Sequence, residues 1–350
     1  MKKMMAIIFF VGVLIVTSCD KSSTEPEAQI KTPDEMIWIA DTLKRDYSSI
    51  SLVPQDLKVF SPNDVWLVCD GDISRGLLWH YDGKIWKESN LYEDVGDVKI
   101  FAIEGNSSSD LWVGGLAGTK SFLGHFDGTK WTRYSKEFNN YLVDITKDNK
   151  GNFWACGMNG LILKYSNGIW EENYVNFNLN SNFMEKSAFF NILFYNNEIH
   201  LLGLKFWFGR KDVHYHVKGK FNNWAIVDSQ TYNDYRIYKF GYGGFATIDN
   251  KLYSYGVGGI WKYTGNQWQN IFKSDIEIIN IDGLNENYLL AVGLSNKLYF
   301  YDGNSWSDKS TIVNNGNYRG FLRLCRTDGK YSFLASLLTD IHELMVMRGN

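Results

Sequence analysis

Oxygen-bearing side chains alternate along the segment Asp70-Gly71-Asp72-Ile73-Ser74-Arg75-Gly76. Hard cations such as calcium prefer oxygen ligands, and calcium-binding loops place these ligands at alternate positions. An EF-hand loop, however, needs glycine where Arg75 stands and a bidentate glutamate where Tyr81 stands. The segment therefore fits a solvated turn better than a calcium site.

A second group of potential ligands is formed by histidines. His214 and His216 flank Tyr215, so their side chains point to the same side if this segment is a strand. Together with His200 they would supply the three protein ligands of a catalytic zinc site. The same position of other repeats, however, holds either His or Lys, which is typical of a polar strand surface: His80, His125, Lys164 and Lys262. We therefore predict no metal and no cofactor.

The segment Phe206-Trp207-Phe208-Gly209-Arg210-Lys211 combines three aromatic rings with two cations. Aromatic rings beside cations suit the recognition of a sugar or a peptide. The alternative is that the rings pack between structural repeats. The sequence alone leaves both interpretations open.

Motifs of nucleophilic, metal-dependent or nucleotide-dependent catalysis are missing from the sequence, which has no G-x-S-x-G, H-E-x-x-H or Walker loop. The acidic pair Glu171-Glu172 cannot share a substrate, because adjacent strand residues face opposite sides. The first hypothesis is therefore a non-catalytic binding or scaffold module for a protein or carbohydrate. The alternative is a carbohydrate-active hydrolase or lyase, which needs two or more carboxylates, or a histidine with a carboxylate, converging on one site.

The composition favours a β-rich globular protein. The 350 residues are 45% hydrophobic and 16% aromatic, with 32 Gly and only 4 Pro. Aromatic residues favour strands, and glycine favours tight turns. Lys and Arg number 36 against 39 Asp and Glu, a net charge of −3, so no basic excess indicates a nucleic-acid partner.

One sequence motif recurs about every 44 residues: an aromatic residue, a short turn and a tryptophan. Asp-Gly and Asn-Gly turns between apolar runs are strong hairpin signals. A degenerate copy ends at Trp224. The clear copies are Tyr81–Trp86, Phe126–Trp131, Tyr165–Trp170, Tyr263–Trp268 and Tyr301–Trp306.

Each repeat contains four apolar segments separated by turns, the pattern of a four-stranded propeller blade. Seven units begin near Asp56, Asp97, Tyr141, Ala188, Tyr238, Ile276 and Tyr318. The seventh lacks its tryptophan-bearing strand, whereas Met36-Ile37-Trp38 stands alone before the first unit. We therefore predict an all-β fold over residues 36–350: a seven-bladed β-propeller of four-stranded antiparallel blades, closed by the N-terminal strand.

Two repeat families share parts of this pattern. The segment from Asp148 to Trp154 resembles the D-x-x-G-x-x-W repeat of two-component-regulator sensor propellers. The series Gly114-Gly115, Phe126 and Trp131 is similar to kelch repeats. Both resemblances imply a propeller.

The N-terminus has the features of an export signal. Lys2 and Lys3 precede an apolar run from Met4 to Val16, which is too short to span a bilayer comfortably. Val16-Thr17-Ser18-Cys19 resembles the bacterial lipobox, and this resemblance implies lipidation of Cys19 and a membrane partner through that lipid. We expect a signal peptide over 1–18, a flexible tether over 19–35, and an extracytoplasmic location, periplasmic or on the cell surface; an ordinary signal peptide is the alternative.

Cys69, Cys156 and Cys325 remain after this segment. Three cysteines cannot all pair, and their spacing fits no metal motif. We expect buried free thiols, although one disulfide is compatible with an oxidising compartment.

Loops that exceed the minimum length of the repeat are the expected place for ligand recognition. We expect three long loops, after the second strands of units one, two and four. The ligand-binding residues predicted on them are Asp70, Asp72, Arg75, Lys120, Trp207, Arg210 and Lys211.

Overall fold

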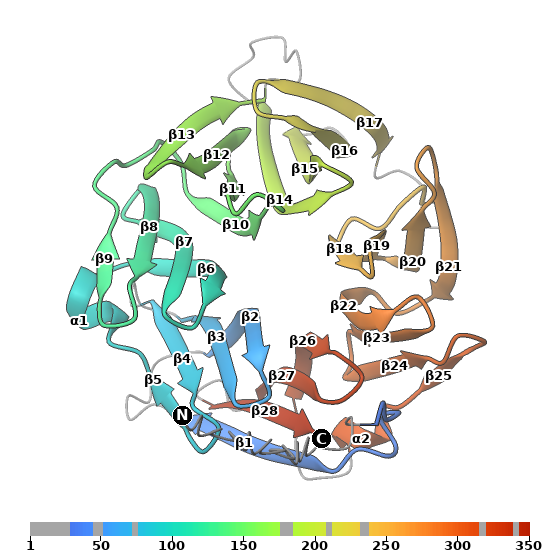
Figure 1. The fold of residues 1–350 in the computed structure, drawn as a ribbon. Helices are drawn as coiled ribbons and strands as arrows, with labels where there is room; N and C mark the ends of the chain where they lie inside the picture. The colour runs from blue at the N-terminus through green and yellow to red at the C-terminus, as the bar shows by residue number, and fades with distance from the viewer. Residues whose placement is uncertain are drawn as a thin grey trace, which may run out of the picture.

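The computed structural model describes residues 29–44, 52–71, 76–175, 185–207, 212–231, 238–314, 320–338 and 343–350. These residues form seven four-stranded antiparallel sheets arranged in a ring (Figure 1). The predicted seven-bladed propeller is therefore confirmed. Neither described helix is long and apolar enough to cross a membrane.

The strands of each blade follow one another from the inside of the ring to its rim. Blade one contains β2 (Val53–Ser61), β3 (Asp64–Asp70), β4 (Leu77–Tyr81) and β5 (Trp86–Glu88). Blade two contains β6 (Lys99–Ser107), β7 (Asp110–Ala117), β8 (Lys120–Phe126) and β9 (Trp131–Arg133). Blade three contains β10 (Leu142–Lys147), β11 (Phe153–Gly157), β12 (Leu161–Ser166) and β13 (Ile169–Tyr174).

The next three blades repeat this order. Blade four contains β14 (Glu185–Tyr195), β15 (Glu198–Trp207), β16 (Val213–Lys220) and β17 (Asn223–Thr231). Blade five contains β18 (Gly244–Ile248), β19 (Lys251–Gly256), β20 (Gly258–Tyr263) and β21 (Trp268–Ser274). Blade six contains β22 (Ile278–Asn285), β23 (Tyr288–Gly293), β24 (Lys297–Tyr301) and β25 (Trp306–Asp308). Two short helices, α1 (Leu91–Val95) and α2 (Thr311–Asn314), follow β5 and β25.

The seventh blade combines both ends of the chain. Its strands β26 (Gly320–Thr327), β27 (Ser332–Leu338) and β28 (Glu343–Gly349) are completed by β1 (Trp38–Lys44). The antiparallel register of β1 and β28 runs from Trp38 opposite Gly349 to Lys44 opposite Glu343. The N-terminal strand thus closes the ring as predicted, because its pairing covers an edge that β28 would otherwise expose.

Burial explains why the second strand of each blade is almost continuously apolar. The five residues from Val65 to Cys69 are all buried, as are all six residues of β23. Both faces of such a strand contact a neighbouring blade, so the apolar clusters lie between blades. One of these clusters, for example, joins Leu67 of blade one to Val346 of blade seven.

The predicted Asp-Gly hairpins share one turn structure. Asp82 Oδ1 accepts hydrogen bonds from the backbone amides of Lys84 and Ile85, each at 3.0 Å. Gly83 has a φ of 87°, which favours glycine over any residue with a side chain. Asp127 and Asp302 make the same pair of contacts in blades two and six.

Residues 31–35 were expected in a flexible tether, but they lie on the propeller. The backbone amide of Lys31 donates to the Gly329 carbonyl at 2.8 Å, and the Tyr288 hydroxyl donates to the Lys31 carbonyl at 2.7 Å. Asp34 also forms an ion pair with Lys309. These contacts attach the chain to the propeller before β1 begins.

A polar cluster joins the closing strand to blade one. Arg348 on β28 donates to both carboxylate oxygens of Asp41 on β1, at 2.7 and 3.3 Å. Arg348 also donates to the Tyr81 hydroxyl at 2.6 Å and lies over the Tyr81 ring. The Trp86 indole donates to Asp41 at 3.1 Å. These contacts connect the first blade to the last.

Replacing Arg348 with Met should weaken this connection while keeping most of the apolar stem. We expect a loss of about 2 kcal/mol in the free energy of unfolding, between the values for exposed and buried ion pairs. The measurement is thermal or denaturant unfolding. Lys297→Met, which removes the more exposed Lys297–Asp308 pair, is the control and should leave stability nearly unchanged. Equal effects of the two substitutions would contradict the role of the cluster in closure.

Candidate functional site

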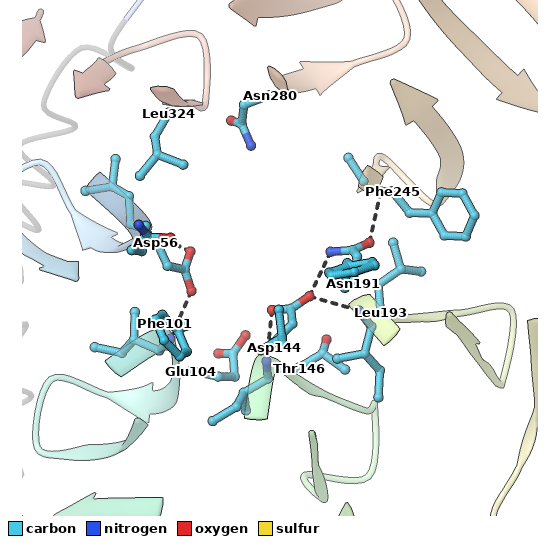
Figure 2. A pocket seen from close by; sticks show the side chains of 18 of the residues that line it. Asp56, Phe101, Glu104, Asp144, Thr146, Asn191, Leu193, Phe245, Asn280 and Leu324 are labelled. Atoms are coloured by element: carbon cyan, nitrogen blue, oxygen red, sulfur yellow. Dashed lines mark hydrogen bonds between the residues drawn. The ribbon is translucent and has the colours of Figure 1, made fainter. Parts of the chain in front are cut away.

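A cavity of about 720 Å³ lies at the centre of the ring and is lined mainly by the innermost strand of each blade (Figure 2). We call this cavity the channel. This volume is within the range of small-molecule and cofactor sites. The inner strands are β2, β6, β10, β14, β18, β22 and β26. The cavity is therefore the candidate site, and every blade contributes to its wall.

Four inner strands carry an Asp or Asn directly after a β-bulge. The bulge turns this side chain toward the next blade, where its oxygen accepts a hydrogen bond from a backbone amide. We call these four contacts the inter-blade hydrogen bonds. They are Asp56 to Ile103 (2.9 Å), Asp144 to Ile192 (2.9 Å), Asn191 to Phe245 (2.9 Å) and Asn280 to Cys325 (3.0 Å).

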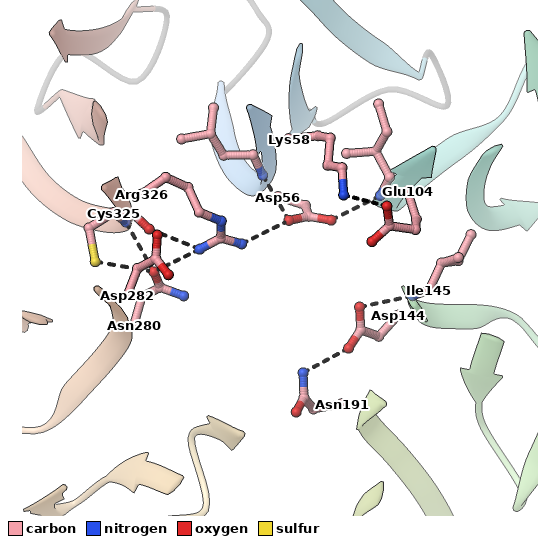
Figure 3. Close-up of polar contacts among 12 residues, drawn as sticks. Asp56, Lys58, Glu104, Asp144, Ile145, Asn191, Asn280, Asp282, Cys325 and Arg326 are labelled. Carbon is pink, nitrogen blue, oxygen red and sulfur yellow. Dashed lines mark hydrogen bonds and ion pairs between the residues drawn. The ribbon is translucent and has the colours of Figure 1, made fainter. Parts of the chain in front are cut away.

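Charged side chains lie on the same wall (Figure 3). Lys58 forms an ion pair with Glu104, and Arg326 lies 3.5 Å from Asp56. Burial raises the pKa of Asp56 and of Asp282, and the Arg326 guanidinium opposes part of each rise. Burial acts to lower the pKa of Arg326, but Asp282 and Asp56 hold it above its ordinary value.

Asp144 differs from the other carboxylates because its hydrogen-bond partners are neutral. It accepts from the backbone amides of Ile145 and Ile192 and from the Asn191 side chain, at 2.7 to 2.9 Å. Burial, followed by the negative charge of Asp56, raises the pKa of Asp144 to about 7. In the described parts of the chain, no cation forms an ion pair with Asp144.

This pKa predicts how Asp144 affects stability. A carboxyl whose pKa is higher in the folded state lowers stability when it ionises, so the effect grows between about pH 4 and pH 7. The difference in melting temperature, Asp144→Asn minus wild type, should therefore be larger at pH 8 than at pH 5.

The control for this measurement is Asp308→Asn, because the pKa of Asp308 is lowered. Asp308 is then ionised at both pH values, and its difference from wild type should not change. A constant difference for Asp144→Asn as well would contradict the assignment.

Aromatic side chains surround the end of the cavity where the inner strands begin, which we call the aromatic mouth. Phe101 and Tyr141 lie with ring centroids 6.0 Å apart, and Phe190 is 37% exposed. Antiparallel order places this mouth on the same face as the turns between second and third strands. The mouth is thus on the face predicted to bind ligand.

The predicted ligand-binding residues do not line the cavity where the structure describes them. Asp70 ends β3 and pairs with Lys99 at 3.1 Å, while Lys120 begins β8 and donates to Asn139. Trp207 ends β15, and its side chain is outside the described residues. Asp72, Arg75, Arg210, Lys211 and Cys19 also lie outside them. These site assignments therefore remain predictions.

Two of the expected long loops are shorter than predicted. In unit two, β7 ends at Ala117 and β8 begins at Lys120, because Gly118 adopts a φ of 62° in a two-residue turn. In unit four, Phe206 and Trp207 belong to β15, since β14 continues beside it to the pair Glu185–Trp207. Strand pairing thus absorbs residues that were expected in irregular loops.

The histidines have structural partners. His200 Nδ1 and His216 Nε2 are 2.8 Å apart and buried, whereas His214 stacks on Tyr242. Burial lowers the pKa of His200 and His214 to about 4 and that of His216 to about 3. The described residues contain no group of three or more potential metal ligands.

The three remaining cysteines, Cys69, Cys156 and Cys325, are buried free thiols, as predicted. Burial raises the pKa of each thiol. They are therefore poor nucleophiles at neutral pH.

A serine, a histidine and an aspartate meet between blades one and two, but not as a catalytic triad. Asp64 and Ser108 both approach His80 Nε2, at 2.9 and 3.4 Å. In a triad, the aspartate binds Nδ1 and leaves Nε2 to accept the serine proton. Here Asp64 occupies the nitrogen that would have to act as base.

Sequence reasoning missed the residues of the cavity wall. A signal was present, because Asp56-Leu57, Asp144-Ile145, Asn191-Ile192 and Asn280-Ile281 repeat one polar-apolar step in the first strand of four units. A polar residue at the same position of several apolar strands indicates a shared structural contact. This repeated polar residue is visible when the repeats are aligned by their first strands rather than by their tryptophans.

The fold is shared with several solved structures. YCF48 bound to D1 peptide has a TM-score of 0.59 at 13% identity, with 92% of this chain and 98% of that chain covered. A streptogramin B lyase has a TM-score of 0.57 at 12% identity, covering 89% and 98%. PorZ, a surface component of the type-IX secretion system of Porphyromonas gingivalis, has a TM-score of 0.56 at 15% identity, covering 84% of this chain and 46% of PorZ.

No protein-family model matches the chain, and no curated protein matches its sequence. At these low identities, the structural similarity establishes the β-propeller fold alone, because this fold supports both binding proteins and enzymes.

Proposed function

We propose that this protein is a non-catalytic binding module that receives an extended segment of a partner protein at the aromatic mouth of the channel. The observation that carries this proposal is an open cavity of about 720 Å³ with aromatic rings at its entrance. The carboxylates Asp56 and Asp144 on its wall are already engaged in holding neighbouring blades. The structural similarity to YCF48 bound to D1 peptide supports a peptide ligand.

A tryptophan at position 247 tests where such a segment binds. Thr247 is exposed and lines the cavity, so Thr247→Trp should fill part of the channel without disturbing the core. Peptides selected from a random library on the wild type should bind this variant about tenfold more weakly or worse, measured by fluorescence polarisation.

The matched control is Thr132→Trp on the exposed face of β9, which adds the same side chain away from the channel. It should bind the selected peptides like the wild type. Peptides that bind Thr247→Trp equally well would place the site elsewhere and overturn the proposal.

A carbohydrate-active hydrolase or lyase is the second candidate. It is favoured by one observation, that the carboxylates Asp56 and Asp144 both line the cavity. Such an enzyme would release new reducing ends from an oligosaccharide panel, and Asp56→Asn would abolish the release. Release by wild-type protein alone would favour this candidate over the binding module.

We also propose that the protein is a lipoprotein anchored through Cys19 outside the cytoplasm. Lys31 is bonded to Gly329, in the turn where the inner strand β26 ends. This turn lies on the face opposite the aromatic mouth, because all inner strands begin at the mouth. An anchor preceding Lys31 would leave the mouth facing away from the membrane. PorZ, a bacterial surface component with this fold, supports an envelope location.

The anchor is tested by replacing Cys19 with Ala. Metabolic labelling with an alkyne fatty acid should mark the wild type, and the substitution should abolish the label and release the protein from the membrane fraction. Cys69→Ala is the control and should keep the label, because that thiol is buried. A labelled Cys19→Ala variant would contradict the proposal.

A further inference from the structure

The cations of the channel wall are already paired. The charged residues that line the cavity are four carboxylates, Asp56, Glu104, Asp144 and Asp282, and two cations, Lys58 and Arg326. Lys58 pairs with Glu104, and Arg326 lies between Asp56 and Asp282 and interacts with both. With all six groups ionised, the wall has an excess of two negative charges.

This negative excess includes Asp144. Its three hydrogen bonds come from two backbone amides and one amide side chain, none of which carries a charge. Asp144 is also the carboxylate near which Asp56 adds further negative charge. Figure 2 shows its carboxylate among the side chains that line the pocket. A positive group of a ligand would therefore gain a charge-assisted contact here without breaking an ion pair of the protein.

The route to Asp144 suits a long side chain that is apolar along its stem and charged at its tip. The aromatic mouth, with Phe101, Tyr141 and Phe190, lies at the bulge level of the inner strands, beside Asp144. Aromatic rings pack against methylene groups and attract a cation over their faces. A bare metal ion fits less well, because the described residues contain no group of three or more metal ligands.

We propose that the channel accepts a lysine or arginine side chain of the partner segment, with its charged end against Asp144 and its stem between the rings of the aromatic mouth. This inference rests on the proposed function, and it adds the chemistry of the residue that enters the channel. A guanidinium fits a carboxylate with two parallel hydrogen bonds, so arginine is the better occupant of the two.

Two small probes separate charge from shape. Butylguanidinium has the stem and charge of arginine, and N-butylurea is its neutral analogue. In amide NMR titrations, butylguanidinium should shift the signals of Ile145 and Ile192 and bind at least about tenfold more tightly than N-butylurea. Asp144→Asn should remove this difference between the probes.

A second pair of variants keeps the proposal testable if Asp144→Asn does not fold. Thr146 lies two residues from Asp144 on β10, so both side chains face the cavity. Thr146→Lys would supply a cation from the protein itself and should abolish butylguanidinium binding. Thr146→Met, which has no charge, should weaken that binding by about threefold or less.

The outcomes distinguish this inference from the proposed function. If peptides bind the wild type but not Thr247→Trp, while butylguanidinium and N-butylurea bind equally or not at all, the channel binds peptides and the cationic occupant is wrong. If Thr146→Lys and Thr146→Met affect butylguanidinium equally, the role of charge is also wrong. If peptides bind both the wild type and Thr247→Trp, the proposed function fails, and this inference fails with it.

Discussion

The inter-blade hydrogen bonds hold neighbouring inner strands together at the centre of this ring. Apolar packing between blades is strong but has little direction, so it does not by itself fix how far each inner strand lies from the next. A side-chain oxygen that accepts a backbone amide 45 to 54 residues further along the chain sets that distance. A bulge in the strand makes the contact possible, because it turns the side chain along the wall. These contacts fix the spacing of inner strands at four of the seven junctions between blades.

The same contacts determine the electrostatics of the channel. Asp56 and Asp144 are needed as acceptors, and this places two carboxylates on a wall that is partly shielded from water. Arg326 relieves the charge near Asp56, whereas Asp144 receives only neutral donors. A structural requirement has therefore left a negative site beside an aromatic entrance. This carboxylate beside the aromatic rings is the feature on which the proposed recognition of a cationic side chain rests.

The N-terminal segment and the aromatic mouth lie on opposite faces of the closed ring. The strand β1 joins β28, and Lys31 contacts Gly329 and Tyr288 at two of the turns where inner strands end. The aromatic mouth lies on the other face, together with Asp70 and Lys120. The chain therefore enters the domain on one side and presents its cavity on the other.

The blades, their number and their closure could all be predicted from the amino-acid sequence. Asp82-Gly83 and its copies specify tight turns, and the runs around Trp66 or Trp112 specify buried strands, because turn geometry and strand burial depend on residues close together in the chain. Even Trp38, which closes the ring, was recognisable, since a seventh unit lacked the strand that this residue begins.

The residues that form the channel wall, in contrast, could be identified only in the folded ring. Asp56 and Arg326 are 270 residues apart, and they meet because seven separately encoded strands surround one axis. Whether Phe206 and Trp207 form a loop or extend a strand was likewise decided by the length of the partner strand β14. Contacts of this kind depend on the curvature of the whole ring, so a local pattern of residues does not predict them.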